Sequence, residues 1–288
     1  VRQFAAENGH VGSRHYGRWS AKEHALKQAL AELINAPSDD DIALLKSTSE
    51  GLSVIAYGID WQPGDNIVIA AEEFPSNRIV WESLRPNGVE VREAHLFAGD
   101  DPEQALIELM DDNTRLLSVS AVQYASGLRM DLARLSQACK QHDSLFCVDA
   151  IQHIGALQFD VQAIAADFVV ADGHKWMLGP EGLALFYCRH ELIDTLKLHQ
   201  FGWHMVEAMG HFDDPQWAPA GNARRFECGS PNMLGIHALQ ASIQVLLDQG
   251  MAQVEQQLLK RSARLIDGLN QMNSVDIITD CRAERRSG

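Results

Sequence analysis

Short apolar runs alternate along most of the chain with stretches of helical periodicity. The apolar runs predict strands at 42–45, 66–71, 89–96, 116–122, 144–149, 167–171 and 183–188. The stretches between them predict helices at 77–84, 100–110 and 131–142, and another that follows a polar turn at 47–51 and reaches residue 59. Near the start, Ser20 and Glu23 have the spacing of a capping box, which predicts a helix beginning at Ser20. The order predicts an α/β fold with a mainly parallel sheet, whose uniformly apolar strands fit burial on both faces.

The last part of the chain has a different character. The elements predicted after residue 232 are helices at 233–249 and 251–272 and a final strand at 275–278. We therefore expect a large domain at 1–232 and, at 233–288, a linker helix with the start of a smaller C-terminal α+β domain. The chain begins with valine and ends soon after an apolar run, so we expect a fragment that lacks a short N-terminal and a longer C-terminal piece.

Charge and cysteine content limit the classes of partner, cellular compartment and metal site that we expect for this protein. Its 288 residues carry a formal net charge of -15, which disfavours binding to nucleic acid or to an anionic membrane surface, and no apolar run is long enough to span a bilayer. The five cysteines are dispersed and include no C-x-x-C pair, which fits a reducing cytoplasm. No histidine and cysteine spacing is typical of zinc, so we expect no metal.

Polar residues follow several predicted strands, at the edge where open parallel sheets bind ligands. Lys175 has glycine, apolar and aromatic neighbours, where a buried ammonium is costly and a neutral amine attacks aldehydes; a head group that reaches solvent is the alternative. Asp149 ends an apolar strand and suits a pyridinium nitrogen, or else caps a helix. Thr48 and Ser49 begin a helix that suits a phosphate, or else cap it.

Single aromatic and amide residues complete this set. Phe74 could stack on a planar ring or belong to the core, and Gln152 and Tyr124 could contact a ring oxygen. Taken one by one these residues say little. Their order along the chain, namely a phosphate turn, an aromatic, Asp-x-x-Gln and then His-Lys, describes a site for pyridoxal phosphate, which has a phosphate, a ring nitrogen and an aldehyde.

The same residues resemble a known family, the class V aminotransferases of pyridoxal-phosphate fold type I. This group includes cysteine desulfurases, selenocysteine lyases, kynureninases and isopenicillin N epimerase-like proteins. The matching segments are STSEG (47–51), EEFPSN (72–77), VDAIQ (148–152), ADGHKWMLGPEG (171–182) and RRFECGSPN (224–232). They cover nearly the whole chain in the family's order.

The resemblance implies a role for each site residue. Lys175 would form the Schiff base with the cofactor and then act as general base on the substrate. The other implied cofactor contacts are Asp149 at the ring nitrogen, Gln152 and Tyr124 near the ring hydroxyl, Phe74 on the ring face, Thr48, Ser49 and His174 at the phosphate, and Ser230 at the phosphate of a neighbouring subunit. The last contact implies a homodimer with a shared active site.

Three departures from the family pattern bear on function. Desulfurases and selenocysteine lyases stack a histidine on the ring, and Phe74 cannot move protons as a histidine does, so their chemistry is disfavoured. Asp172 replaces a frequent phosphate-binding serine and is left out of the phosphate set, because two anions repel. The arginine that binds the substrate carboxylate and the mobile catalytic cysteine of desulfurases have no counterpart in these residues.

We therefore expect an aminotransferase-like enzyme that acts on a small amino acid or amine. The runner-up is a carbon–sulfur lyase of the cysteine desulfurase type or an amino-acid epimerase, and a non-catalytic protein of this fold comes last. A nicotinamide-dependent oxidoreductase is set aside because no G-x-G-x-x-G follows a strand. For His199, His204 and His211 we expect packing at the surface or at an interface.

Overall fold

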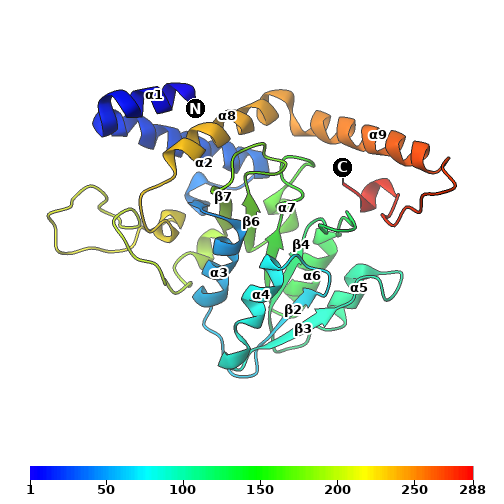
Figure 1. Ribbon diagram of the computed structural model, residues 1–288. Helices are drawn as coiled ribbons and strands as arrows, with labels where there is room; N and C mark the ends of the chain where they lie inside the picture. Colours follow the sequence, from blue (N-terminus) through cyan, green and yellow to red (C-terminus); the bar gives the residue numbers. More distant parts are fainter. Residues whose placement is uncertain (288) are drawn as a thin grey trace.

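A seven-stranded sheet forms the centre of the protein in the computed structural model, which describes residues 1–287. The strands are β1 (Ile42–Leu45), β2 (Asn66–Ala70), β3 (Glu90–Ala94), β4 (Thr114–Ser120), β5 (Leu145–Asp149), β6 (Phe168–Asp172) and β7 (Ala184–Cys188). Their order is β1-β7-β6-β5-β4-β2-β3, and β7 alone runs against its neighbours in this sheet. The predicted α/β fold with a mainly parallel sheet is confirmed (Figure 1).

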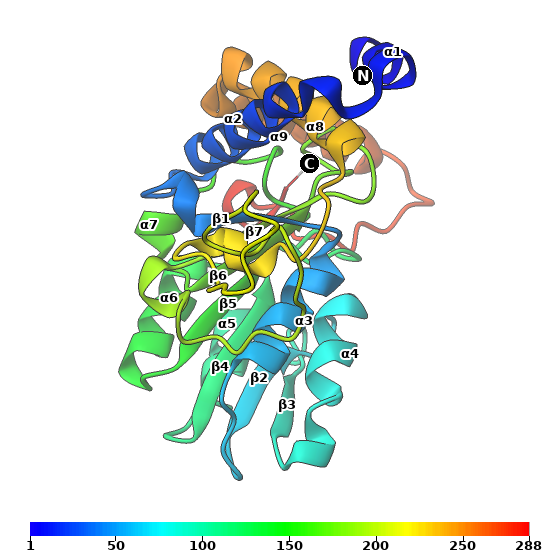
Figure 2. The ribbon, with the colours of Figure 1, turned by 90° about the vertical axis from the view of Figure 1, so that its left-hand side faces the viewer.

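Helices cover both faces of this sheet (Figure 2). They are α1 (Arg2–Val11), α2 (Tyr16–Ile34), α3 (Thr48–Gly58), α4 (Ser76–Glu82), α5 (Pro102–Ile107), α6 (Leu132–Gln141), α7 (Val161–Ile164), α8 (Met233–Gln249) and α9 (Met251–Leu269). The core on one face includes residues of α3 and α4, and the core on the other includes residues of α2, α5, α6 and α8. Successive strand residues belong to opposite cores, because side chains alternate across a sheet.

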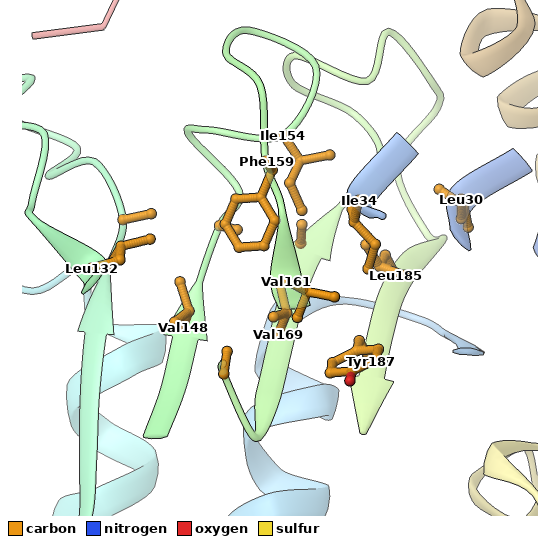
Figure 3. Close-up of a cluster of buried hydrophobic side chains, with 14 of the residues drawn as sticks. Leu30, Ile34, Leu132, Val148, Ile154, Phe159, Val161, Val169, Leu185 and Tyr187 are labelled. Atoms are coloured by element: carbon orange, nitrogen blue, oxygen red, sulfur yellow. The ribbon is translucent and has the colours of Figure 1, made fainter. Parts of the chain in front are cut away.

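The larger core lies between the sheet and α2. Figure 3 shows Val148, Val169 and Leu185 from three adjacent strands in one cluster with Leu30 and Ile34 of α2. The neighbouring strand residues, such as Phe168 and Phe186, belong to the core beneath α3. Both faces of these central strands therefore exclude water, which accounts for their near-continuous apolar sequences, whereas β3 at the sheet edge is polar and partly exposed.

Local signals place several helix starts correctly. Asp131 accepts a hydrogen bond from the Arg134 amide at 3.1 Å and begins α6. Asp101 does the same for Gln104 at 3.0 Å and begins α5, with proline in the first turn. Each carboxylate satisfies an amide that has no partner within its helix.

Two predictions of local structure are wrong. Helix α2 begins at Tyr16 and not at Ser20, whose hydroxyl donates to the Tyr16 carbonyl at 3.4 Å from inside the helix. The first turn of α2 holds the buried Trp19, so tertiary packing extends the helix past the capping signal. Residues 275–278 form no strand, and Ile278 is 83% exposed. A strand needs a neighbour to pair with, and none of the described strands lies beside this segment.

The end of the chain contacts the loop that follows β4. The Arg129 amide donates to the Arg285 carbonyl at 2.8 Å, and Leu128 and Arg286 form an isolated antiparallel bridge. Before this contact, α9 extends past the sheet and buries none of its residues fully (Figure 1). The division into domains at residue 232 stays a prediction.

Candidate active site

The predicted site residues lie beyond the carboxyl ends of five strands. Thr48 and Ser49 follow β1, Phe74 follows β2, Tyr124 follows β4, Gln152 follows β5, and His174 and Lys175 follow β6, while Asp149 is the last residue of β5. These five strands run in the same direction, since β7 is antiparallel to both of its neighbours. Their carboxyl ends therefore meet at one edge of the sheet, where ligands of such sheets bind.

An amine lies over an accessible aromatic face at this edge. The Lys175 Nζ is 5.7 Å from the centroid of the Phe74 ring, within the range of a cation–π contact. The Tyr124 ring meets Phe74 edge to face, with 5.3 Å between the centroids. Phe74 is 44% exposed and Tyr124 is 50% exposed. An aromatic face left open beside a lysine is suited to a flat ligand that carries an electrophile.

Asp149 is buried without a cationic partner. It is 2% exposed, and its Oδ1 accepts a hydrogen bond from the Ile151 amide at 3.0 Å. Burial, together with the charge of Glu73, raises its pKa to about 7, although Lys175 draws it down. Across residues 1–287 no side chain donates a hydrogen bond to this carboxylate. A buried acid in this state suits a ligand that presents a protonated ring nitrogen.

The predicted phosphate residues gather at the start of α3. The Thr48 Oγ1 accepts a hydrogen bond from the Asp172 amide at 3.1 Å, which joins α3 to the end of β6. The Asp172 Oδ1 is 3.0 Å from the His174 Nδ1, but the two atoms do not have the geometry of a hydrogen bond. The Ser49 hydroxyl donates to the Ser76 hydroxyl at 2.8 Å. The group thus combines two hydroxyls, an imidazole and the amides of a helix N-terminus.

A glycine allows α3 to come this close to the sheet. A Cβ atom on Gly51 would lie 2.8 Å from the Val170 Cγ1 on β6. Any larger residue would therefore push α3 away from β6 and separate Thr48 from Asp172. At the N-cap of the same helix, the Ser47 hydroxyl accepts from the Glu50 amide at 3.3 Å.

Two predicted residues have other partners. The Gln152 Oε1 accepts a hydrogen bond from the Nε1 of Trp176 at 3.2 Å. Trp176 directly follows Lys175 in the chain. Ser230 accepts from the Trp203 Nε1 at 3.4 Å and lines a cavity of about 300 Å³ with Glu50 and Cys228. Lys175 and Phe74 do not line this cavity, so the structure does not bring Ser230 to the lysine.

His204 contradicts the prediction of surface or interface packing. It is buried, with Nε2 3.4 Å from the Glu23 Oε1 and Nδ1 3.3 Å from the Glu227 Oε2. Despite burial, the two carboxylates raise its pKa to about 9. The ammonium of Lys27 lies 2.7 Å from the Glu227 Oε1. Donor atoms of Glu23, His204 and Glu227 lie close enough for a metal ion, but Lys27 and an imidazolium already balance both carboxylates.

Glu73 is a site residue that sequence reasoning left without a role. It lies between β2 and Phe74, is buried, and accepts hydrogen bonds from the Ser120 amide at 2.7 Å and from the Gln123 Nε2 at 2.9 Å. Burial raises its pKa. A carboxylate directly after an apolar strand was the available signal, but its partners lie 47 and 50 residues away in the chain.

A mainly parallel sheet with a lysine, an aromatic face and an unpaired buried carboxylate at one edge defines a pyridoxal-phosphate enzyme of fold type I. The chain belongs to the aminotransferase class-V family, whose model matches residues 2–288. Pyridoxal phosphate is the cofactor of this family. The residues present fit it, since Asp149 is unpaired and the Phe74 face is open.

The curated relatives are named cysteine desulfurases. A probable cysteine desulfurase of Methanothermobacter thermautotrophicus is 29% identical over 281 residues, which are 96% of this chain and 69% of that protein. The cysteine desulfurase of Klebsiella pneumoniae is 30% identical over 249 residues, which are 84% of this chain and 61% of that protein. The chain thus spans roughly two thirds of the length of these relatives.

Solved structures share the fold closely. A mutant of the C-DES protein with glycine covalently linked to its PLP cofactor has a TM-score of 0.88 and 25% identity, over 99% of this chain and 75% of that one. The complex of C-DES, a cystine C-S lyase, with its product cysteine persulfide has a TM-score of 0.84 and 26% identity, over 94% and 73% of the two chains. None of the helices described here is both long and apolar enough to cross a membrane.

Proposed function

We propose that this protein is a pyridoxal-phosphate-dependent lyase that breaks a carbon–sulfur bond of a cysteine-like amino acid. One observation supports pyridoxal phosphate as the cofactor: the amine of Lys175 lies over the open face of Phe74, at the same sheet edge as the unpaired Asp149. The substrate class is supported by the relatives, because cysteine desulfurases and a cystine C-S lyase are among the proteins it resembles. This reading replaces aminotransfer, our first expectation, with the runner-up.

Each residue of the strand edge has a task in this proposal. Bound pyridoxal phosphate supplies a ring that withdraws electrons from the substrate Cα. Lys175 Nζ would bind the aldehyde carbon of the cofactor and would be the base for the proton of the substrate Cα. Asp149 keeps the proton on the ring nitrogen, and Phe74 covers one ring face. The remaining contacts are Gln152 and Tyr124 near the ring hydroxyl, Thr48, Ser49 and His174 at the phosphate, and Ser230 at the phosphate of a second copy.

The cysteines bear on which carbon–sulfur cleavage occurs. A desulfurase passes sulfur to a thiolate of the protein, whereas a lyase that eliminates the sulfur group needs none. Cys139, Cys147 and Cys188 are buried, and burial raises the pKa of each thiol. Cys228 and Cys281 are more accessible. Elimination is therefore the reaction that needs the fewest of the described residues, because it requires no protein thiolate.

Aminotransfer stays the second candidate, because Phe74 disfavours desulfuration and is compatible with amino transfer. Transfer of the amino group needs only a lysine to move the proton, and a phenylalanine on the ring face leaves that step to Lys175. Elimination is also open to Lys175 as the sole base. The two reactions differ in their products and not in the residues that hold the cofactor.

Product analysis distinguishes the candidates. Cystine and cysteine are incubated with the protein and pyridoxal phosphate, with Lys175→Ala as the control. Elimination yields pyruvate and ammonia, desulfuration yields alanine, and aminotransfer yields a new amino acid only when a 2-oxo acid is added. Pyruvate that depends on Lys175 supports the proposal, and amino transfer without sulfur release refutes it.

Cofactor attachment is tested separately. Visible absorbance with added pyridoxal phosphate, followed by borohydride reduction and peptide mass spectrometry, should find the added mass on the peptide that contains Lys175 and none in Lys175→Ala. Absence of the modification in the wild-type chain contradicts the cofactor assignment. Sedimentation with and without the cofactor tests the proposed homodimer.

A further inference from the structure

One buried carboxylate connects the ends of β2 and β4 at the proposed cofactor site. Glu73 accepts a hydrogen bond from the Ser120 amide at 2.7 Å and another from the Gln123 side-chain amide at 2.9 Å, both on Oε1. Its Oε2 bonds to the Ser120 hydroxyl. Two of these donors are N–H groups that cannot reverse their role, so they suit an ionised acceptor.

The partners of Glu73 are neighbours of residues assigned to the cofactor. Glu73 directly precedes Phe74, and Gln123 directly precedes Tyr124. Ser120 is paired in register with Asp149 across β4 and β5. One carboxylate therefore sets the relative places of the ring face, the tyrosine and the acid that would meet the ring nitrogen.

The charge of Glu73 is costly where it lies. Burial opposes the ionised form, and no ion pair of Glu73 with lysine, arginine or histidine exists within residues 1–287. Its charge also acts on Asp149, since it opposes ionisation of that neighbour. A neutral residue would hold the ends of β2 and β4 together at lower cost, so a carboxylate at this place points to a task that only a charge performs.

We propose that Glu73 is a positioning residue of the cofactor site. It fixes the relative positions of Phe74, Tyr124 and Asp149. Its negative charge disfavours an ionised Asp149 unless a protonated ring nitrogen lies beside that carboxylate. The inference rests on the proposed function, because it takes pyridoxal phosphate as the ligand. Glu73 touches no reacting atom in this proposal and acts through its neighbours.

The decisive variant is Glu73→Gln, which keeps the shape and removes the charge. Affinity is measured from quenching of tryptophan fluorescence when pyridoxal phosphate is added to the cofactor-free protein. We expect the dissociation constant to rise by about tenfold or more, as for the loss of a hydrogen bond to a charged group. Glu103→Gln is the control for loss of a buried carboxylate outside the cofactor contacts; Glu103 is equally buried and accepts from the Asp131 amide at 2.7 Å, and unlike Glu73 it also pairs with Arg285.

A second measurement needs no cofactor. In protein labelled with ¹³C at the aspartate carboxyl carbons, the Asp149 signal is assigned by its absence in Asp149→Asn, and it should titrate with a pKa of about 7. Glu73→Gln should shift this titration to lower pH, and Glu73→Asp, which keeps the charge, should largely restore it. A residue with only a packing role would not move this titration.

The possible outcomes separate the two proposals. If the wild type binds the cofactor while Glu73→Gln binds equally well and leaves the Asp149 titration unchanged, Glu73 is structural and the inference is wrong. If the wild type binds no pyridoxal phosphate, the proposed function fails by itself. If Glu73→Gln does not fold, Glu73→Asp tests the inference. We expect this variant to keep the Asp149 titration and to bind pyridoxal phosphate more weakly. Unchanged affinity for pyridoxal phosphate would contradict the positioning role.

Discussion

Two groups of buried carboxylates in this protein differ in whether positively charged side chains lie beside them. At the strand edge, Asp149 and Glu73 lie near each other, and Lys175 is the cation that acts on Asp149. Behind α2, Glu227 has the Lys27 ammonium at 2.7 Å, the His204 ring at 3.3 Å and the Leu44 amide at 2.7 Å. Within residues 1–287 the first group forms no ion pair, whereas the second is neutralised by Lys27 and His204.

The pKa directions express this difference. Burial raises the pKa of Asp149 to about 7. Burial acts on Glu227 in the same way, but Lys27 and His204 outweigh it and hold the pKa of that carboxyl below its usual value. A buried charge that has all its partners within the chain stabilises a structure, whereas one that lacks them needs a ligand. The missing partner at Asp149 therefore supports the proposed cofactor site.

Breaking the paired group should have the largest effect. Glu227→Ala leaves Lys27 and His204 buried beside a single carboxylate, and it removes the acceptor of the Leu44 amide. We expect the free energy of unfolding to fall by about 3–5 kcal/mol, as when one partner of a buried pair is removed. Urea unfolding of the cofactor-free protein measures it. Glu227→Gln, which keeps an acceptor, should lose less, and a loss below about 1 kcal/mol for alanine would contradict the assignment.

Removing the unpaired charge should have the opposite sign. The pKa of Asp149 in the folded state, about 7, lies above its ordinary value of 3.8, so the wild type loses stability as pH rises from about 4 to 7. At pH 8, Asp149→Asn should therefore raise the unfolding free energy of the cofactor-free protein by about 2–4 kcal/mol, with a smaller gain at pH 5. Pyridoxal-phosphate affinity should fall in the same variant. A variant that loses both stability and affinity would show that Asp149 is paired after all.

The smallest effect concerns the pH dependence of the paired group. The pKa of His204 is raised from 6.5 to about 9, so its contribution is complete below pH 6.5 and is lost as pH rises through 9. The charged groups that face it are Glu23, Glu227 and Lys27. Between pH 7 and pH 10 the wild type should lose about 1–3 kcal/mol more than His204→Gln. Parallel stability curves for the two proteins would indicate a neutral His204.

The gathering of the candidate site residues at one edge of the sheet could be predicted from the sequence. Asp149, Phe74 and Lys175 each follow an apolar run that is a strand, and parallel strands bring their carboxyl ends to one edge whatever their order in the sheet. The helix caps at Asp101 and Asp131 are equally local, since donor and acceptor lie three residues apart.

Contacts between residues far apart in the chain could not be predicted from local sequence patterns. Glu23 has the pattern of a capping residue but lies beside His204, and Glu73 reaches Ser120 on another strand. Residues 275–278 have strand composition without a partner strand. In each case the neighbours come from distant parts of the chain, and the sequence pattern near the residue contains no information about them.

The sequence by itself determined all seven strands of the sheet, most of the helices, and which side chains stand at the strand ends, because these depend on periodicity and on residues a few positions apart. Only the tertiary structure decided which buried charges are paired. Asp149 and Glu227 are both carboxylates in apolar surroundings, and the difference between them is the presence of Lys27 and His204. Those cations come from remote segments, and the energy of a buried charge depends on what lies within a few ångströms in space.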